Sequence, residues 1–169
     1  MKGGVFSRIV RRVATWSRTG ESGSANLSST PRIVAEAVSA GKDIADRLRD
    51  VGFRTDFTLC SLYEIDRLFD RDAPAGVARP GGLFSENVGF SLFALGGYVG
   101  LTLLRELGGE WVGDDRDPEG EINISLKLSD GSIVWPVQRI MMRFRDGAEY
   151  GVGDYGAVLG RSFSASRKP

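Results

Sequence analysis

Histidine is missing from this 169-residue sequence, and cysteine occurs only once, as Cys60. Without histidine, a single chain cannot assemble a Ser-His-Asp triad, a Cys-His dyad or a histidine-based zinc or haem site. One cysteine excludes an intrachain disulfide and a cysteine-rich metal site, and it agrees with a reducing compartment. We therefore expect no cofactor, and the chemistry open to the chain is limited to carboxylates, arginines and hydroxyl groups.

The N-terminus lacks the long apolar run of a secretory signal, because arginines interrupt every apolar stretch of the first twenty residues. We therefore expect a cytoplasmic protein. Charge is also distributed unevenly. Residues 1–18 hold five cations and no acid, residues 161–169 hold three cations, and the zero net charge of the chain leaves −8 for residues 19–160. An acidic body argues against nucleic-acid binding.

Residues 1–18 have apolar side chains near helical spacing with arginines largely opposite, which predicts a short basic amphipathic arm. Such a helix binds an anionic membrane surface, and the alternatives are a helix for a protein partner or a disordered tail. The residues expected to make the contact are Phe6, Arg8, Ile9, Arg11, Arg12, Val13 and Trp16. A flexible Gly/Ser linker is predicted over residues 19–30.

Residues 31–160 predict a single α+β domain, followed by a basic disordered tail over 161–169. Helical spacing is clear in three segments, with Thr30, Thr58 and Pro136 expected at their starts. Alternation over 122–128, the Asp130-Gly131 turn and the segment 110–113 predict three antiparallel strands. In a two-residue turn, Leu128 faces Ile133 and Leu126 faces Trp135. The expected architecture is helices packed on a small antiparallel sheet, with the arm as a separate amphipathic helix.

The segment Val88 to Leu104 is uncharged over seventeen residues, which is the lower limit for a membrane span. Four glycines favour a buried core helix, capped by Ser85 and stopped at Gly108-Gly109. Gly89, Gly96 and Gly100 lie on one stripe, where missing side chains allow close packing of another helix.

Two further patterns imitate known binding sites. Gly151 to Val158 fits a phosphate-binding glycine motif, but no βαβ unit or kinase lysine strand accompanies it, so we interpret it as a helical closing segment. Asp115, Asp117 and Glu119 imitate the start of a calcium loop, although the position of the bidentate glutamate is Leu126. An acidic solvated loop is the simpler interpretation.

Arg139 and Arg143 lie one turn apart on the polar face of a predicted helix and could form a small patch for an anion or an acidic partner. Cys60 is expected near a helix start as an inert, partly buried residue, since no histidine can act as its base.

Three stretches carry a resemblance to a family of small uncharacterised bacterial α+β domains, over about Asp56 to Tyr155. They are "DFTLCSLYEIDRLFD", "LGGYVGLTLLRELGGEWV" and "VWPVQRIMMRFRDGAEY". The resemblance implies short helices, a central glycine-containing helix that runs into a strand, a hairpin and a helix that starts at proline. It implies no activity. Similar domains often carry an acidic residue at the position that follows "GGYVG", where this chain has Leu101.

The sequence thus favours a non-enzymatic interaction domain, with an unknown protein partner, attached peripherally to a membrane or a partner through its arm. The alternative is a small metal-assisted hydrolase that uses the acidic loop from Asp114 to Glu121.

Overall fold

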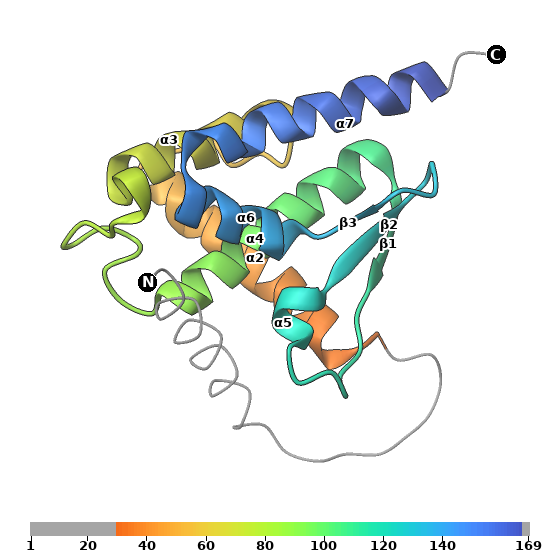
Figure 1. The fold of residues 1–169 in the computed structure, drawn as a ribbon, viewed down its shortest axis with the longest axis horizontal. Helices are drawn as coiled ribbons and strands as arrows, with labels where there is room; N and C mark the ends of the chain where they lie inside the picture. The colour runs from red at the N-terminus through yellow and green to blue at the C-terminus, as the bar shows by residue number, and fades with distance from the viewer. Residues whose placement is uncertain (1–29, 167–169) are drawn as a thin grey trace.

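The long helix α4 (Val88–Leu107) lies at the centre of the fold, and a second long helix, α2 (Arg32–Asp50), packs along it (Figure 1). The structure is a computed structural model that describes residues 30–166. The fold is α+β, as the sequence predicts, with helices around a small antiparallel sheet. The predicted arm and most of the predicted linker lie outside the described residues.

Glycines set how closely α2 and α4 approach. A Cβ on Gly97 would lie 2.2 Å from the carbonyl oxygen of Ala37, and one on Gly41 would lie 2.5 Å from the carbonyl carbon of Gly97. Gly41 and Gly97 therefore bring two helix backbones into direct contact, in the way small residues do elsewhere. The glycines of the predicted stripe make room for other neighbours: Gly96 lies against Val137, and Gly100 lies against the ring of Trp111.

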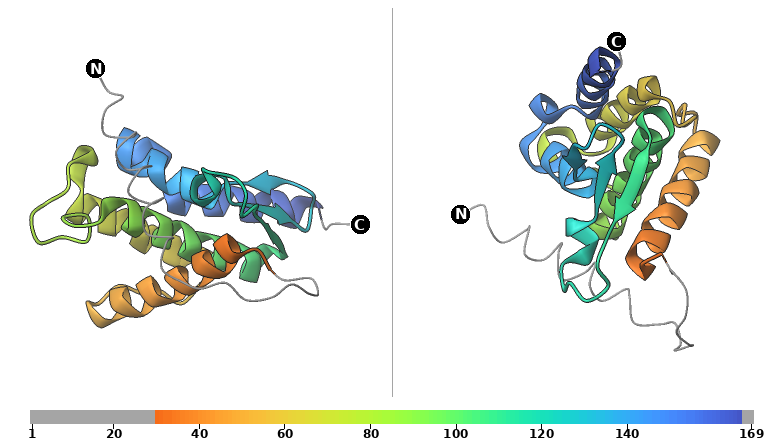
Figure 2. Two further views of the ribbon diagram at one scale, coloured as in Figure 1. Left: turned by 90° about the horizontal axis from the view of Figure 1, so that it is seen from below. Right: turned by 90° about the vertical axis from the view of Figure 1, so that its right-hand side faces the viewer.

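Helix α6 covers the side of α4 opposite to α2. Figure 2 shows α4 between α2 on one side and α6 on the other. The C-terminal helix α7 packs along α3. The other helical elements are η1 (Leu59–Ser61), α3 (Leu62–Asp72), η2 (Pro74–Gly76), α5 (Gly120–Asn123), α6 (Pro136–Asp146), η3 (Ala148–Tyr150) and α7 (Val152–Ser166).

The sheet has three antiparallel strands in the order β1-β2-β3. They are β1 (Gly109–Val112), β2 (Ser125–Leu128) and β3 (Ile133–Val134), so the predicted strand over 122–128 is shorter and begins after the single turn of α5. Trp111 points from β1 onto α4 at Gly100. Leu126 and Leu128 are buried below the sheet.

The predicted register of the hairpin is wrong by one residue. Leu126 pairs with Val134 and Lys127 with Ile133. The loop has three residues, because the Leu128 N–H donates to the Ser132 carbonyl at 2.8 Å and Gly131 adopts a φ of +86°. This is a type I turn followed by a left-handed glycine. A one-residue shift exchanges the faces of a strand, so Val134 is buried while Ile133 and Trp135 are exposed.

Two predicted caps are also wrong. The first turn of α2 is not capped by Thr30, since the Asp115 carboxylate accepts hydrogen bonds from the backbone N–H groups of Arg32, at 2.7 Å, and Ile33, at 2.9 Å. The cap residue of α4 is Asn87, not Ser85. At η1 the prediction is confirmed, because the Thr58 hydroxyl accepts from the Ser61 N–H.

The expected boundary at residue 160 is wrong as well. Helix α7 continues through Arg161 to Ser166, so the predicted disordered tail cannot begin at 161. Phe163 explains the extension, because its side chain is buried against the rest of the molecule. Burial of an aromatic ring stabilises the added helical turn, which residue composition alone does not reveal.

Among the described residues, α4 is long and apolar enough to cross a membrane by length and composition. Within this fold, 72% of its most apolar window is buried by the other elements. Its main partners are α2 and α6, and it also contacts α7, β2 and η1. A core helix of this length passes the same test of length and composition.

Candidate functional site

Residues of the arm, from Phe6 to Trp16, lie outside the described part of the chain. The structure therefore bears on the other predicted site residues. It separates them into three places: Arg139 and Arg143 on α6, the acidic loop before α5, and the glycine motif in α7.

The sequence predicts that Arg143 belongs to a surface patch, and this prediction is wrong because the side chain is buried. Its side chain is 4% exposed, its Nε donates to Asp66 at 2.9 Å, and its Nη2 donates to Asp70 at 2.5 Å. Both carboxylates come from α3. A buried guanidinium needs such partners, because an unpaired charge is costly inside a protein. Arg143 thus joins α6 to α3.

Arg139 is also partly withdrawn from solvent. Its guanidinium lies 4.5 Å from the ring centre of Tyr155 and 5.6 Å from that of Tyr150, and its Nη2 donates to the Gly151 carbonyl at 2.9 Å. Burial lowers the pKa of Arg139 from its usual value and raises the pKa of the Tyr155 phenol. The two arginines therefore do not form the predicted exposed patch, because each is occupied by the helix or loop beside it.

The acidic loop is organised by its own hydrogen bonds. Asp115 caps α2, while Asp117 accepts from the Glu119 N–H at 2.9 Å and from the Asn123 amide at 2.8 Å. Arg116 pairs with Asp114 and lowers the pKa of that carboxyl. Among residues 30–166, no three His, Cys, Asp or Glu side chains gather in a way that could hold a metal ion. The carboxylates predicted as ligands, Asp115, Asp117 and Glu119, do not converge.

The glycine motif is part of a helix, as the sequence predicts. Its glycines make room for neighbouring side chains: Gly153 faces the ring of Tyr63, and Gly156 faces Leu62. The start of α7 is capped by Asp66, whose two oxygens accept from the N–H groups of Val152, at 2.9 Å, and Gly153, at 2.8 Å. A carboxylate thus occupies the place where a phosphate would bind a helix N-terminus.

Cys60 lies in η1 and is exposed, so its predicted partial burial is wrong. Its neighbours in η1, Leu59 and Ser61, turn inward instead.

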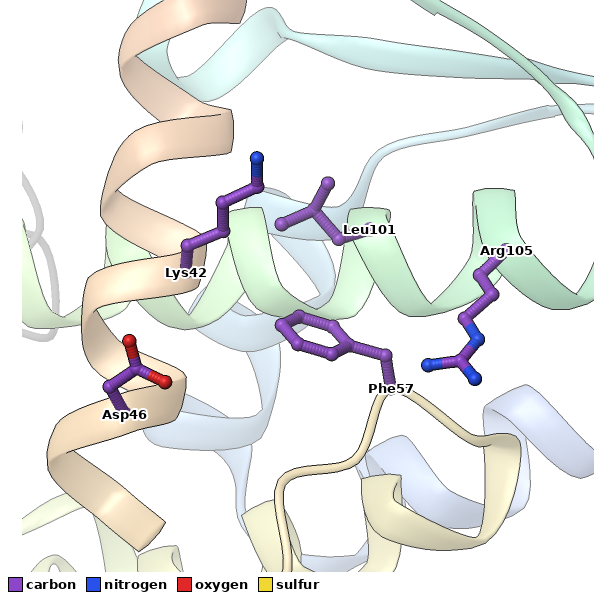
Figure 3. Close-up of a pocket in the computed structure, with 5 residues that line it drawn as sticks. All are labelled: Lys42, Asp46, Phe57, Leu101 and Arg105. Atoms are coloured by element: carbon purple, nitrogen blue, oxygen red, sulfur yellow. The ribbon is translucent and has the colours of Figure 1, made fainter. Parts of the chain in front are cut away.

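A surface hollow of about 440 Å³ lies between α2, the segment before η1 and the C-terminal half of α4. Figure 3 shows its lining, in which a phenyl ring and a leucine form the floor and two cations lie on opposite sides of them. The lining residues are Lys42, Asp46, Phe57, Leu101 and Arg105. Among the described sites, this hollow best combines an apolar surface with charged groups, which is the usual composition of a ligand site.

Phe57 reaches the floor through an unusual backbone conformation. Its φ is +58°, in the left-handed region that bulky residues seldom adopt. The Tyr98 hydroxyl accepts from the Phe57 N–H at 3.4 Å, and the two rings lie 5.0 Å apart. Tyr98 is fully buried, and its hydroxyl is hydrogen-bonded to the Ser61 hydroxyl. Burial raises the pKa of the Tyr98 phenol. The core therefore holds Phe57 in its strained position.

The lining of the hollow carries two cations, Lys42 and Arg105, and one carboxylate, Asp46. Arg105 donates from Nη1 to the carbonyl oxygen of Asp56 at 2.9 Å, which fixes its guanidinium beside Phe57. Asp46 lies on the side of α2 and pairs with Arg49 at 2.7 Å. Sequence reasoning missed this site because its parts are far apart in the chain.

Compared with known proteins, the chain matches no family model, no curated protein and no solved structure. The resemblance described above therefore stays a prediction.

Proposed function

We propose that this protein is a non-enzymatic interaction domain that attaches to an anionic membrane surface through its basic arm and presents its folded body to a protein partner. The attachment would be peripheral, at the cytoplasmic face. The observation that carries the proposal is the segregation of charge, with five cations and no acid in residues 1–18 against −8 in residues 19–160.

The physical basis is the attraction of a polybasic segment to anionic lipid. Each lysine or arginine near such a surface contributes about 1 kcal/mol, and apolar side chains such as Phe6 and Trp16 add burial at the headgroup boundary. The acidic body is repelled by the same surface. The arm would therefore bind reversibly while the body faces the cytoplasm.

The folded part supports a binding role over chemistry. Three charged groups that a hydrolase could use for chemistry have structural roles here. Arg143 pairs with Asp66 to join α6 to α3, and Asp115 caps the start of α2. The hollow beside Phe57 pairs two cations with an apolar floor, which suits recognition.

The test is co-sedimentation of the full chain with phosphatidylserine-containing and pure phosphatidylcholine vesicles, at low and high salt. Wild-type protein is expected to bind the anionic vesicles only, and less at high salt, because salt screens the attraction. The triple variant Arg8→Glu, Arg11→Glu and Arg12→Glu is expected to lose binding by at least about a hundredfold, from the contribution of each charge.

A matched control changes the net charge equally on the folded part, where Arg47, Arg79 and Arg161 are exposed. The Arg47→Glu, Arg79→Glu, Arg161→Glu variant is expected to bind much more tightly than the arm variant. Equal loss in both variants would reduce the effect to net charge. No vesicle binding by the wild type would reject membrane attachment and favour a protein partner for the arm.

A further inference from the structure

We infer that the hollow beside Phe57 is a binding site for a small molecule with an apolar body and a carboxylate group. None of its lining residues belongs to the arm, so the inference does not depend on membrane attachment. Its volume of about 440 Å³ lies within the range of small-molecule sites, roughly 300–1,000 Å³.

The floor supplies the apolar contact. The Phe57 ring and the Leu101 side chain lie next to each other in Figure 3, and both are only partly buried, so they present apolar surface to the hollow. A left-handed φ at Phe57 is strained, and such strain gathers at ligand sites. Here the strained backbone places a ring on the floor of a hollow.

The walls supply the charge. Arg105 uses one guanidinium nitrogen on the Asp56 carbonyl, and the residue is exposed beside the floor. A guanidinium has five donors in a planar fork that matches a carboxylate. Lys42, on the opposite side of the floor, adds a second cation from α2 (Figure 3).

The one carboxylate of the lining does not cancel this preference. Asp46 is paired with Arg49 at 2.7 Å, and Figure 3 places Asp46 on the side of α2, away from Arg105. An anionic group therefore meets Arg105 at one side of the floor, while the apolar body lies over Phe57 and Leu101.

The probe is octanoate, compared with octan-1-ol and octylammonium, which keep the alkyl chain and change the charge. Binding to the full chain is measured by titration calorimetry, and the site is located by amide chemical shifts. Octanoate is expected to bind at least about tenfold more tightly than octanol, as a charge-assisted hydrogen bond implies. Shifts should centre on the backbone amides of Phe57, Leu101 and Arg105.

Arg105→Gln and Lys42→Gln change exposed side chains, so the fold should persist. Each is expected to weaken octanoate by about tenfold and to leave octanol unchanged. Leu101→Asp places a carboxylate on the floor and should abolish octanoate binding. The matched control is Lys127→Gln, an exposed lysine on β2 outside the hollow, which should bind like the wild type.

The arm variant Arg8→Glu, Arg11→Glu, Arg12→Glu separates this inference from the proposed function, because it should bind octanoate normally. Loss of octanoate binding in the arm variant, equal binding of octanol and octanoate, or no effect of both Arg105→Gln and Leu101→Asp would overturn the inference. So would the absence of octanoate binding to the wild type.

Discussion

Asp66 is a single residue on which three helices depend. It lies on α3, accepts from the Arg143 guanidinium of α6, and accepts from the first two N–H groups of α7. Asp70, one turn later, also contacts Arg143, but its side chain is 67% exposed, against 18% for Asp66. The two ion pairs of Arg143 therefore contribute differently to stability, because water screens the pair with Asp70 more than the pair with Asp66.

This difference gives a prediction for stability. Asp66→Ala should reduce the free energy of unfolding by about 3 kcal/mol or more, since it leaves Arg143 buried without its main partner and uncaps α7. Asp70→Ala should cost less than about 1 kcal/mol, as for an exposed pair. Urea denaturation of both variants measures the two values. Equal costs would show that the arginine does not rely on Asp66.

Arg143 also shows which residue-level features the sequence conceals. Its position on the polar face of an amphipathic helix predicts exposure, and that prediction is wrong because α6 packs against α4 on one side and lies beside α3 on the other. The period of apolar residues reports one buried face only. The contact of α6 with α3 is made by an ion pair, and the spacing of apolar residues therefore does not reveal it.

At the scale of elements, local patterns predicted most helices but not how they begin or pair. Helix α6 starts at Pro136, as expected, and ends before Gly147, because proline and glycine act locally. The cap of α2 could not be predicted, since Asp115 is 83 positions away from Arg32. The hairpin was shifted by one residue because Asp130-Gly131 fits a two-residue loop as well as the last two positions of a three-residue loop.

The cap of α2 gives the second stability prediction. Asp115→Ala should destabilise the protein by about 0.5–2 kcal/mol, the usual cost of losing an N-cap, with or without added calcium. Glu119→Ala, in the same loop and exposed, is the control and should stay within about 0.5 kcal/mol of the wild type. Thermal unfolding with calcium and with EDTA measures both. A calcium-dependent stabilisation lost in both variants would instead support the metal-site hypothesis.

At the scale of the whole molecule, the α+β class was predictable and the arrangement of its helices was not. The contact of Gly41 with Gly97 decides how α2 lies on α4, yet the sequence stripe pointed to Gly89, Gly96 and Gly100. The hollow depends on the same arrangement, because Lys42 comes from α2, Phe57 from the segment before η1, and Leu101 from α4. Sites formed by distant segments leave no local spacing for a sequence to show.

Charge gives the whole molecule two parts with different roles in the proposed function. The arm is basic, and the body is acidic and folded around α4. Attachment should therefore involve one end of the chain and leave the hollow and the surfaces of α2 and α6 available to a partner.

Hydrogen–deuterium exchange of the full wild-type chain, with and without phosphatidylserine-containing vesicles, tests this division most directly. We expect slower exchange on the vesicles within residues 5–18 and unchanged exchange over residues 30–166, with no protection on phosphatidylcholine vesicles. Protection of the folded body with none in the arm, or no protection anywhere, would contradict attachment through the arm.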